Sequence, residues 1–236
     1  MSHPSFATLH RIGAVAGGGT ATILLVNAAK RAELIPTTAV TQLVAPLAQI
    51  LALALITVLY LAYGRRAGTF GLVGYLLNAF SLAALVGVEF VINLVFAELP
   101  VDTIDALRAG PLGVALTVAS VAFLLSTSLF VTAMVRTGEV PTTPLVLYAV
   151  GAVPVSLRAV VPEAALNTGL VVMAIGVGWT ALWLFARSSR LPLANPAPAN
   201  APRPRANDTN SDSMSAHHRA VAAAGRAKAA HMGGSR

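Results

Sequence analysis

Glu89 is the residue of this chain with the clearest capacity for chemistry, because it is an ionisable side chain inside a long apolar segment, Phe70–Leu94. A charge in such a segment is costly unless it pairs, binds a ligand or carries a proton. A helix turns by about 100° per residue, which places Asn78 within about 20° and Asn93 within about 40° of Glu89 around the axis. The spacing therefore predicts one polar stripe of Asn78, Glu89 and Asn93.

Four more polar residues occur at a comparable depth in other apolar segments. Arg158 is the basic residue of a late segment, and Pro154, one turn earlier, interrupts the helical ladder and frees a carbonyl. A buried charge without a partner would cost roughly several kcal/mol, so we expect Glu89 and Arg158 to approach each other. The candidate polar cluster comprises Glu89, Arg158, Asn93, Asn78, Gln49, Asn27 and Asn167.

This cluster allows three roles: contact between helices, an outward-facing pocket for a small ligand or proton, and catalysis. Amides and ion pairs between membrane helices each contribute on the order of 1 kcal/mol, so helix contact alone can account for them. We expect no histidine inside the bundle, and Glu89 is the only acidic residue within the apolar segments. General acid–base or metal chemistry normally needs more groups. We therefore expect no enzymatic activity, no catalytic residue, no cofactor and no metal.

Cysteine is absent from the chain, which excludes disulfide, thiol-nucleophile and cysteine–zinc chemistry. The composition is 56% hydrophobic and 11% charged, which is outside the range of ordinary soluble domains. Such a composition favours a protein that lies within the bilayer.

The elements that must hold the cluster are six apolar segments of membrane length. A helix needs roughly 20 apolar residues to cross a bilayer core, and helices of a soluble core would show a polar face. The segments run over Ile12–Ala29, Val40–Tyr63, Phe70–Leu94, Leu112–Val135, Leu145–Val161 and Leu166–Ala186. The predicted fold is therefore all-α, a polytopic bundle of six transmembrane helices over residues 1–187, with a disordered C-terminal tail.

The distribution of Lys and Arg predicts the orientation, because these residues are enriched in cytoplasmic loops. With six helices both termini lie on one side, which holds six basic residues near helix ends against four on the other: Arg11, Arg65, Arg66, Arg136, Arg187 and Arg190 against Lys30, Arg31, Arg108 and Arg158. Both termini are predicted in the cytoplasm. On the opposite side, Val101–Ala109 is predicted to form a short surface helix that Asp102 caps.

The tail, residues 188–236, is predicted to be disordered, basic and cytoplasmic, because it is rich in Pro, Ala and polar residues. It carries seven Lys or Arg residues and two Asp residues. It either remains solvated and enforces the orientation or contacts anionic lipid headgroups. No nucleic-acid partner is expected, because no aromatic residue is interleaved with the charges.

Several short motifs at the helix ends resemble a group of bacterial six-helix membrane proteins of about this length whose function is undefined. The motifs are Arg11-Ile12-Gly13, Tyr60–Arg66, Gly110-Pro111-Leu112 and Arg136–Leu145 with Pro141 and Pro144. The resemblance covers the bundle and implies a bacterial plasma membrane protein, without supplying catalytic residues.

Two functional hypotheses follow from the sequence. The first is a non-enzymatic structural or accessory bundle, in contact with the lipid bilayer and with a membrane-protein partner. The alternative is a small transporter or ligand sensor that uses the outer polar cluster around Glu89 and Arg158.

Overall fold

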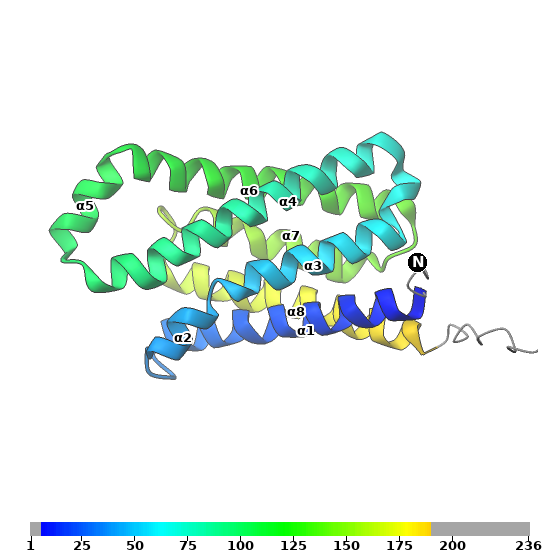
Figure 1. Ribbon diagram of the computed structural model, residues 1–236, viewed down its shortest axis with the longest axis horizontal. Helices are drawn as coiled ribbons and strands as arrows, with labels where there is room; N and C mark the ends of the chain where they lie inside the picture. The colour runs from blue at the N-terminus through cyan, green and yellow to red at the C-terminus, as the bar shows by residue number, and fades with distance from the viewer. Residues whose placement is uncertain (1–5, 190–236) are drawn as a thin grey trace, which may run out of the picture. The chain divides into compact units, whose positions relative to one another are not determined.

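The computed structural model describes residues 6–189, which form an all-α bundle (Figure 1). Its long helices are α1 (Phe6–Arg31), α3 (Leu47–Ala62), α4 (Gly68–Phe90), α6 (Pro111–Thr137), α7 (Thr142–Ser156) and α8 (Glu163–Ser188). Two short helices, α2 (Ala39–Val44) and α5 (Val101–Ala109), lie at the end of the bundle away from the start of α1 (Figure 1). The start of α1 and the end of α8 lie at the same end (Figure 1).

Five stretches of the described chain are long and apolar enough to cross a membrane: Phe6–Arg31, Ala39–Ala62, Gly64–Glu98, Pro111–Thr137 and Glu163–Ser188. Large apolar side chains remain exposed on the outer faces of these helices, including Val15, Phe80, Leu125 and Leu182. Such surfaces are unfavourable in water and suit contact with lipid. By helix length and hydropathy, the chain is a multi-pass integral membrane protein.

The fifth predicted segment, Leu145–Val161, is shorter in the structure than the sequence suggested. Helix α7 ends at Ser156 after 15 residues, which is about 22 Å, less than the roughly 30 Å of a bilayer core. Pro154 lacks an N–H group and disturbs the preceding turn, and Pro162 disfavours a helical Val161. The prediction that Arg158 lies inside a helix is therefore wrong, since Arg158 lies in the turn that follows α7.

Other predicted boundaries also shift. Val40–Tyr63 is divided into α2 and α3 at Pro46, and Phe70–Leu94 ends in a π-helical turn, η2 (Val91–Val95), followed by a 3₁₀ turn, η3 (Phe96–Glu98). The surface helix α5 has the predicted bounds, but Pro100 is its N-cap and no side chain caps it, so the capping role of Asp102 is wrong. The predicted tail lies outside the described residues from position 190 onward.

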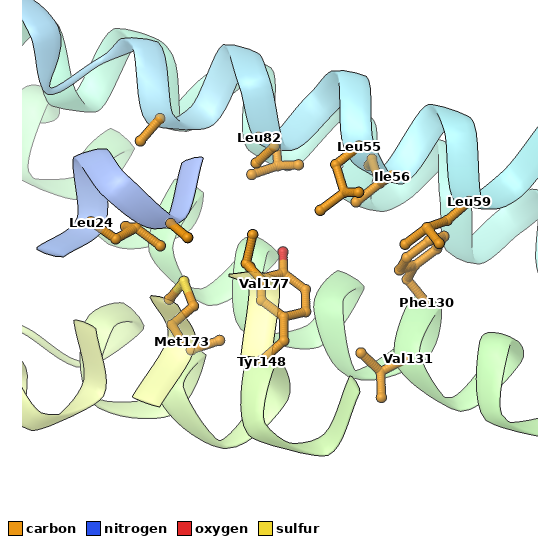
Figure 2. Close-up of a cluster of buried hydrophobic side chains, with 14 of the residues drawn as sticks. Leu24, Leu55, Ile56, Leu59, Leu82, Phe130, Val131, Tyr148, Met173 and Val177 are labelled. Atoms are coloured by element: carbon orange, nitrogen blue, oxygen red, sulfur yellow. The ribbon is translucent and has the colours of Figure 1, made fainter. Parts of the chain in front are cut away.

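The two C-terminal helices approach each other closely because glycine faces the contact. A Cβ atom at Gly151 of α7 would lie 2.5 Å from the backbone nitrogen of Met173 and 2.7 Å from the Gly169 carbonyl oxygen in α8. Glycine therefore allows backbone-to-backbone packing at this point. The buried core of the bundle includes Leu59, Phe130, Tyr148 and Val177, which come from four different helices (Figure 2).

Candidate functional site

A cavity of about 130 Å³ lies between the six long helices, near the end of the bundle where α1 finishes and α8 begins. Its inner part is lined by apolar side chains, among them Leu24, Leu82, Leu85, Phe123 and Met173. Its other part is lined by polar and charged side chains, namely Asn27, Lys30, Gln49, Glu89, Asn93 and Arg158, together with Arg31. The cavity is therefore amphipathic along its length.

A chain of four hydrogen-bonded side chains crosses the polar end of the cavity. The Lys30 Nζ donates to Asn93 Oδ1 at 2.9 Å, and the Asn93 amide donates to Glu89 Oε2 at 2.9 Å. The Arg158 Nη1 lies 3.1 Å from the other carboxylate oxygen, Glu89 Oε1. The expected approach of Glu89 and Arg158 is thus present, and Glu89 is bonded at both oxygens.

The backbone around these residues explains how they meet. Asn93 lies in the π-helical turn η2, and its amide also donates to the Glu89 carbonyl oxygen at 3.0 Å. A π turn inserts a residue into the helical repeat and is frequent at functional sites. Helix α7 ends before Arg158, and the chain then turns, with the Val160 N–H donating to the Leu157 carbonyl oxygen. Arg158 therefore reaches Glu89 from this turn.

A second ion pair lies beside this chain of side chains. The Arg31 Nη1 is 2.7 Å from Glu163 Oε1, which joins the end of α1 to the start of α8. Asn27 precedes Arg31 by one helical turn, and Asn167 follows Glu163 by one turn. Both asparagine Oδ1 atoms are buried without a hydrogen-bond partner, and Asn27 lines the cavity whereas Asn167 does not.

Gln49 of α3 is held against its own helix start at the same end of the bundle. With the amide oriented so that its nitrogen faces these acceptors, the nitrogen donates to the Ala45 and Pro46 carbonyl oxygens, at 3.2 and 3.3 Å. Gln49 therefore satisfies carbonyl groups near the break between α2 and α3 while it lines the cavity.

Asn78 does not join this site, contrary to the predicted single stripe. It is fully buried, and its Oδ1 accepts a hydrogen bond from Thr127 at 3.2 Å. Eleven residues separate Asn78 from Glu89, so the two share a helical face but lie about 16 Å apart along the axis. Asn78 belongs instead to a core polar group in which Ser81 and Ser126 share a hydrogen bond of 2.7 Å.

Tyr148 connects the two polar regions and was missed by the sequence reasoning. Its hydroxyl faces Thr127 and Asn78 without a hydrogen bond of normal geometry, and its side chain lines the cavity. Figure 2 shows the hydroxyl pointing across the bundle towards Leu82. No spacing signal in the sequence marks this residue, because a tyrosine in an apolar helix is ordinary.

Lys30 was predicted only as a charge in the loop after the first helix, yet it belongs to the site because α1 continues to Arg31.

The expectation that no histidine lies inside the bundle is wrong. His10 is buried within the bundle at the opposite end, where its Nε2 lies 2.5 Å from the Tyr63 hydroxyl. Arg187 lies over the rings of Tyr63 and Trp183 at that end.

Among residues 6–189, no group of three or more metal-ligating side chains occurs. Comparisons with protein-family models, with curated proteins and with solved structures find no match. The resemblance to bacterial six-helix proteins is thus supported only as far as the apolar multi-pass helices themselves.

Proposed function

We propose that this protein binds a small molecule in the cavity between its helices, as a carrier or sensor without enzymatic activity. The observation that carries the proposal is the hydrogen-bonded chain from Lys30 to Arg158 across the polar end of a cavity whose interior is apolar. Ligand sites in proteins are commonly concave and mostly apolar, with a few polar groups that orient the ligand. The arrangement at this end of the bundle fits that description.

An unfilled cavity with an unpartnered polar atom in its wall favours ligand binding over a purely structural role. Interior side chains normally pack at close to crystal density, and buried polar atoms normally find partners. Here a cavity remains, and Asn27, which lines it, carries a buried oxygen without a partner. A ligand or ordered water in the cavity would satisfy this oxygen. An accessory role through a protein partner stays a prediction, as does lipid contact by the tail.

The side of the membrane that the site faces depends on how often the chain crosses it and in which direction. We infer that helix α7 and the turns up to Val160 make a sixth crossing. The residues near Phe6 and Ser188 then lie on the cytoplasmic side of a bacterial plasma membrane. The basic residues near helix ends support this orientation. The polar end of the cavity then faces away from the cytoplasm.

Cysteine accessibility tests whether the cavity admits a small molecule. Ala52 lines the cavity, whereas Ala133 is buried in the core and does not, and the chain contains no native cysteine. Methyl methanethiosulfonate, a small neutral reagent, is expected to modify the Ala52→Cys variant at least about tenfold faster than Ala133→Cys. Equal, slow modification of both cysteines would count against the proposed function.

A further inference from the structure

We propose that the ligand is an anionic amphiphile, a molecule with one carboxylate or phosphate head on an apolar chain. This inference rests on the proposed function, which requires only that some small molecule binds. The oxyanion head would lie at the charged end of the cavity, and the chain would lie among the apolar side chains beyond it.

The charge balance of the polar end favours an anion. Three cationic side chains line it, Lys30, Arg31 and Arg158. Arg158 is paired with Glu89 and Arg31 with Glu163, whereas Lys30 is hydrogen-bonded to the neutral amide of Asn93. Glu89 also attracts Lys30 electrostatically, so the cluster holds three cations and two carboxylates, an excess of one positive charge.

Glu33 is the nearest acidic residue along the chain after Lys30, and it lines a surface pocket together with Lys30 without pairing with it. It is exposed in the turn after α1 and forms no salt bridge within residues 6–189. A bound anion can therefore supply the missing negative charge, whereas a cationic ligand would add to the excess.

At the polar end of the cavity, Lys30 and Arg158 have further hydrogen-bond donors beside those that they give to Asn93 and Glu89. The Lys30 ammonium has three donors and gives one to Asn93, and the Arg158 guanidinium has five and gives one to Glu89. Glu89 and Asn93 are bonded to each other, so the two cations flank one small group of atoms. Charge-assisted hydrogen bonds to an oxyanion are shorter and stronger than neutral ones. Both cations can therefore contribute donors to one head group.

The rest of the cavity suits an alkyl chain rather than a second polar group. Leu24, Leu82, Leu85 and Met173 provide apolar contact. The polar groups among them are two hydroxyls: that of Thr20, which donates to backbone carbonyl oxygens, and that of Tyr148, which points towards Leu82 in Figure 2. Each methylene of a bound chain would leave water or detergent for this apolar lining. A sugar or nucleotide would instead leave its hydroxyl groups without partners there.

The test compares three ligands of equal chain length: octanoate, octanol and octylammonium. The purified full-length protein in phosphatidylcholine nanodiscs is titrated by calorimetry, and its thermal unfolding is followed in parallel. Octanoate is expected to bind about tenfold more tightly than the other two and to raise the unfolding temperature by about 3 °C. Butyrate, which keeps the head but shortens the chain, is expected to bind at least about tenfold more weakly than octanoate.

Variants show whether octanoate occupies this cavity. Lys30→Gln should weaken octanoate binding about tenfold, and Lys30→Arg should restore it. Arg108→Gln removes a cation from the same end of the bundle outside the cavity and should leave binding unchanged. Ala52→Leu fills the cavity without changing any charge and should abolish binding.

The outcomes separate the two proposals. Tighter binding of octanol or octylammonium, reduced by Ala52→Leu, would overturn the anionic assignment and leave the proposed function intact. No binding of any of the three, together with an unreactive Ala52→Cys variant, would overturn both. Repeating the titration in nanodiscs that contain phosphatidylglycerol distinguishes the source of the anion: competition with octanoate identifies a membrane phospholipid, and its absence identifies a dissolved single-chain acid.

Discussion

Arg158 and Glu89 are separated by 69 residues in the chain, and their side chains meet at 3.1 Å. The contact joins the turn after α7 to the last full turn of α4, so it links two segments that are not neighbours in sequence. Both side chains are mostly buried, with 19% and 17% of their surfaces exposed. A pair in this setting is sensitive to the loss of either partner, because the remaining charge is left without compensation.

A double-mutant cycle of Glu89→Gln and Arg158→Gln should therefore show coupling. Each single variant is expected to lower the free energy of unfolding in mixed detergent micelles by about 1–3 kcal/mol, because an unpaired charge remains. The double variant should lose less than the sum, with a coupling energy of about 1 kcal/mol or more. Additive losses would show that the two side chains do not stabilise each other.

The packing of α7 against α8 predicts a large difference between two Gly→Ala variants. Gly151→Ala should destabilise the protein by about 1–3 kcal/mol, because the new methyl group meets backbone atoms that cannot move aside. Gly87→Ala on α4 meets nothing within 4 Å and should leave stability unchanged or raise it by up to about 1 kcal/mol. Thermal unfolding of the two variants beside the parent protein measures the difference; equal stability would mean that α7 and α8 are farther apart.

The inferred orientation and the sixth crossing are open to cysteine labelling in intact cells with a membrane-impermeant maleimide. Val101→Cys and Val160→Cys, at two exposed positions at the cavity end, should be labelled from outside. Thr142→Cys should react only after permeabilisation. Labelling of Thr142→Cys alone in intact cells would invert the orientation, and protection of Val160→Cys alone would show that α7 does not cross.

The buried contact between His10 and Tyr63 predicts a localised loss of stability. His10 Nδ1 lies 2.6 Å from the Phe6 carbonyl oxygen, which can only accept, so we assign the proton to Nδ1 and the Tyr63 hydroxyl as donor to Nε2. Tyr63→Phe would leave Nε2 buried without a partner and should cost about 1–3 kcal/mol.

Tyr60→Phe is the matched control for this measurement. Tyr60 stacks on Tyr75 through its ring, and its hydroxyl forms no hydrogen bond within residues 6–189. Chemical unfolding of both variants should therefore show a loss for Tyr63→Phe and little change for Tyr60→Phe. A similar loss in both would place the cost in the rings rather than in the hydrogen bond.

The sequence predicted the helical segments and the contact of Glu89 with Arg158. Both the length of an apolar segment and the depth of a residue in the bilayer can be counted along the chain. It misplaced Asn78, since angular position on a helix says nothing of distance along the axis. It also assigned Lys30 to a loop, because no residue near position 30 marks where α1 ends. The cavity itself was beyond the sequence, since an unfilled volume depends on side chains from six helices at once.

The helix that is synthesised first within the described region packs most extensively against the one that is synthesised last. Gly17 of α1 lies against Ala181 of α8, and Arg31 pairs with Glu163 at the other end of the same contact. Membrane helices insert individually and associate afterwards. Gly17 and Arg31 of α1 therefore stay without these contacts until the ribosome has produced α8, and a chain that stops before α8 would leave one side of α1 open.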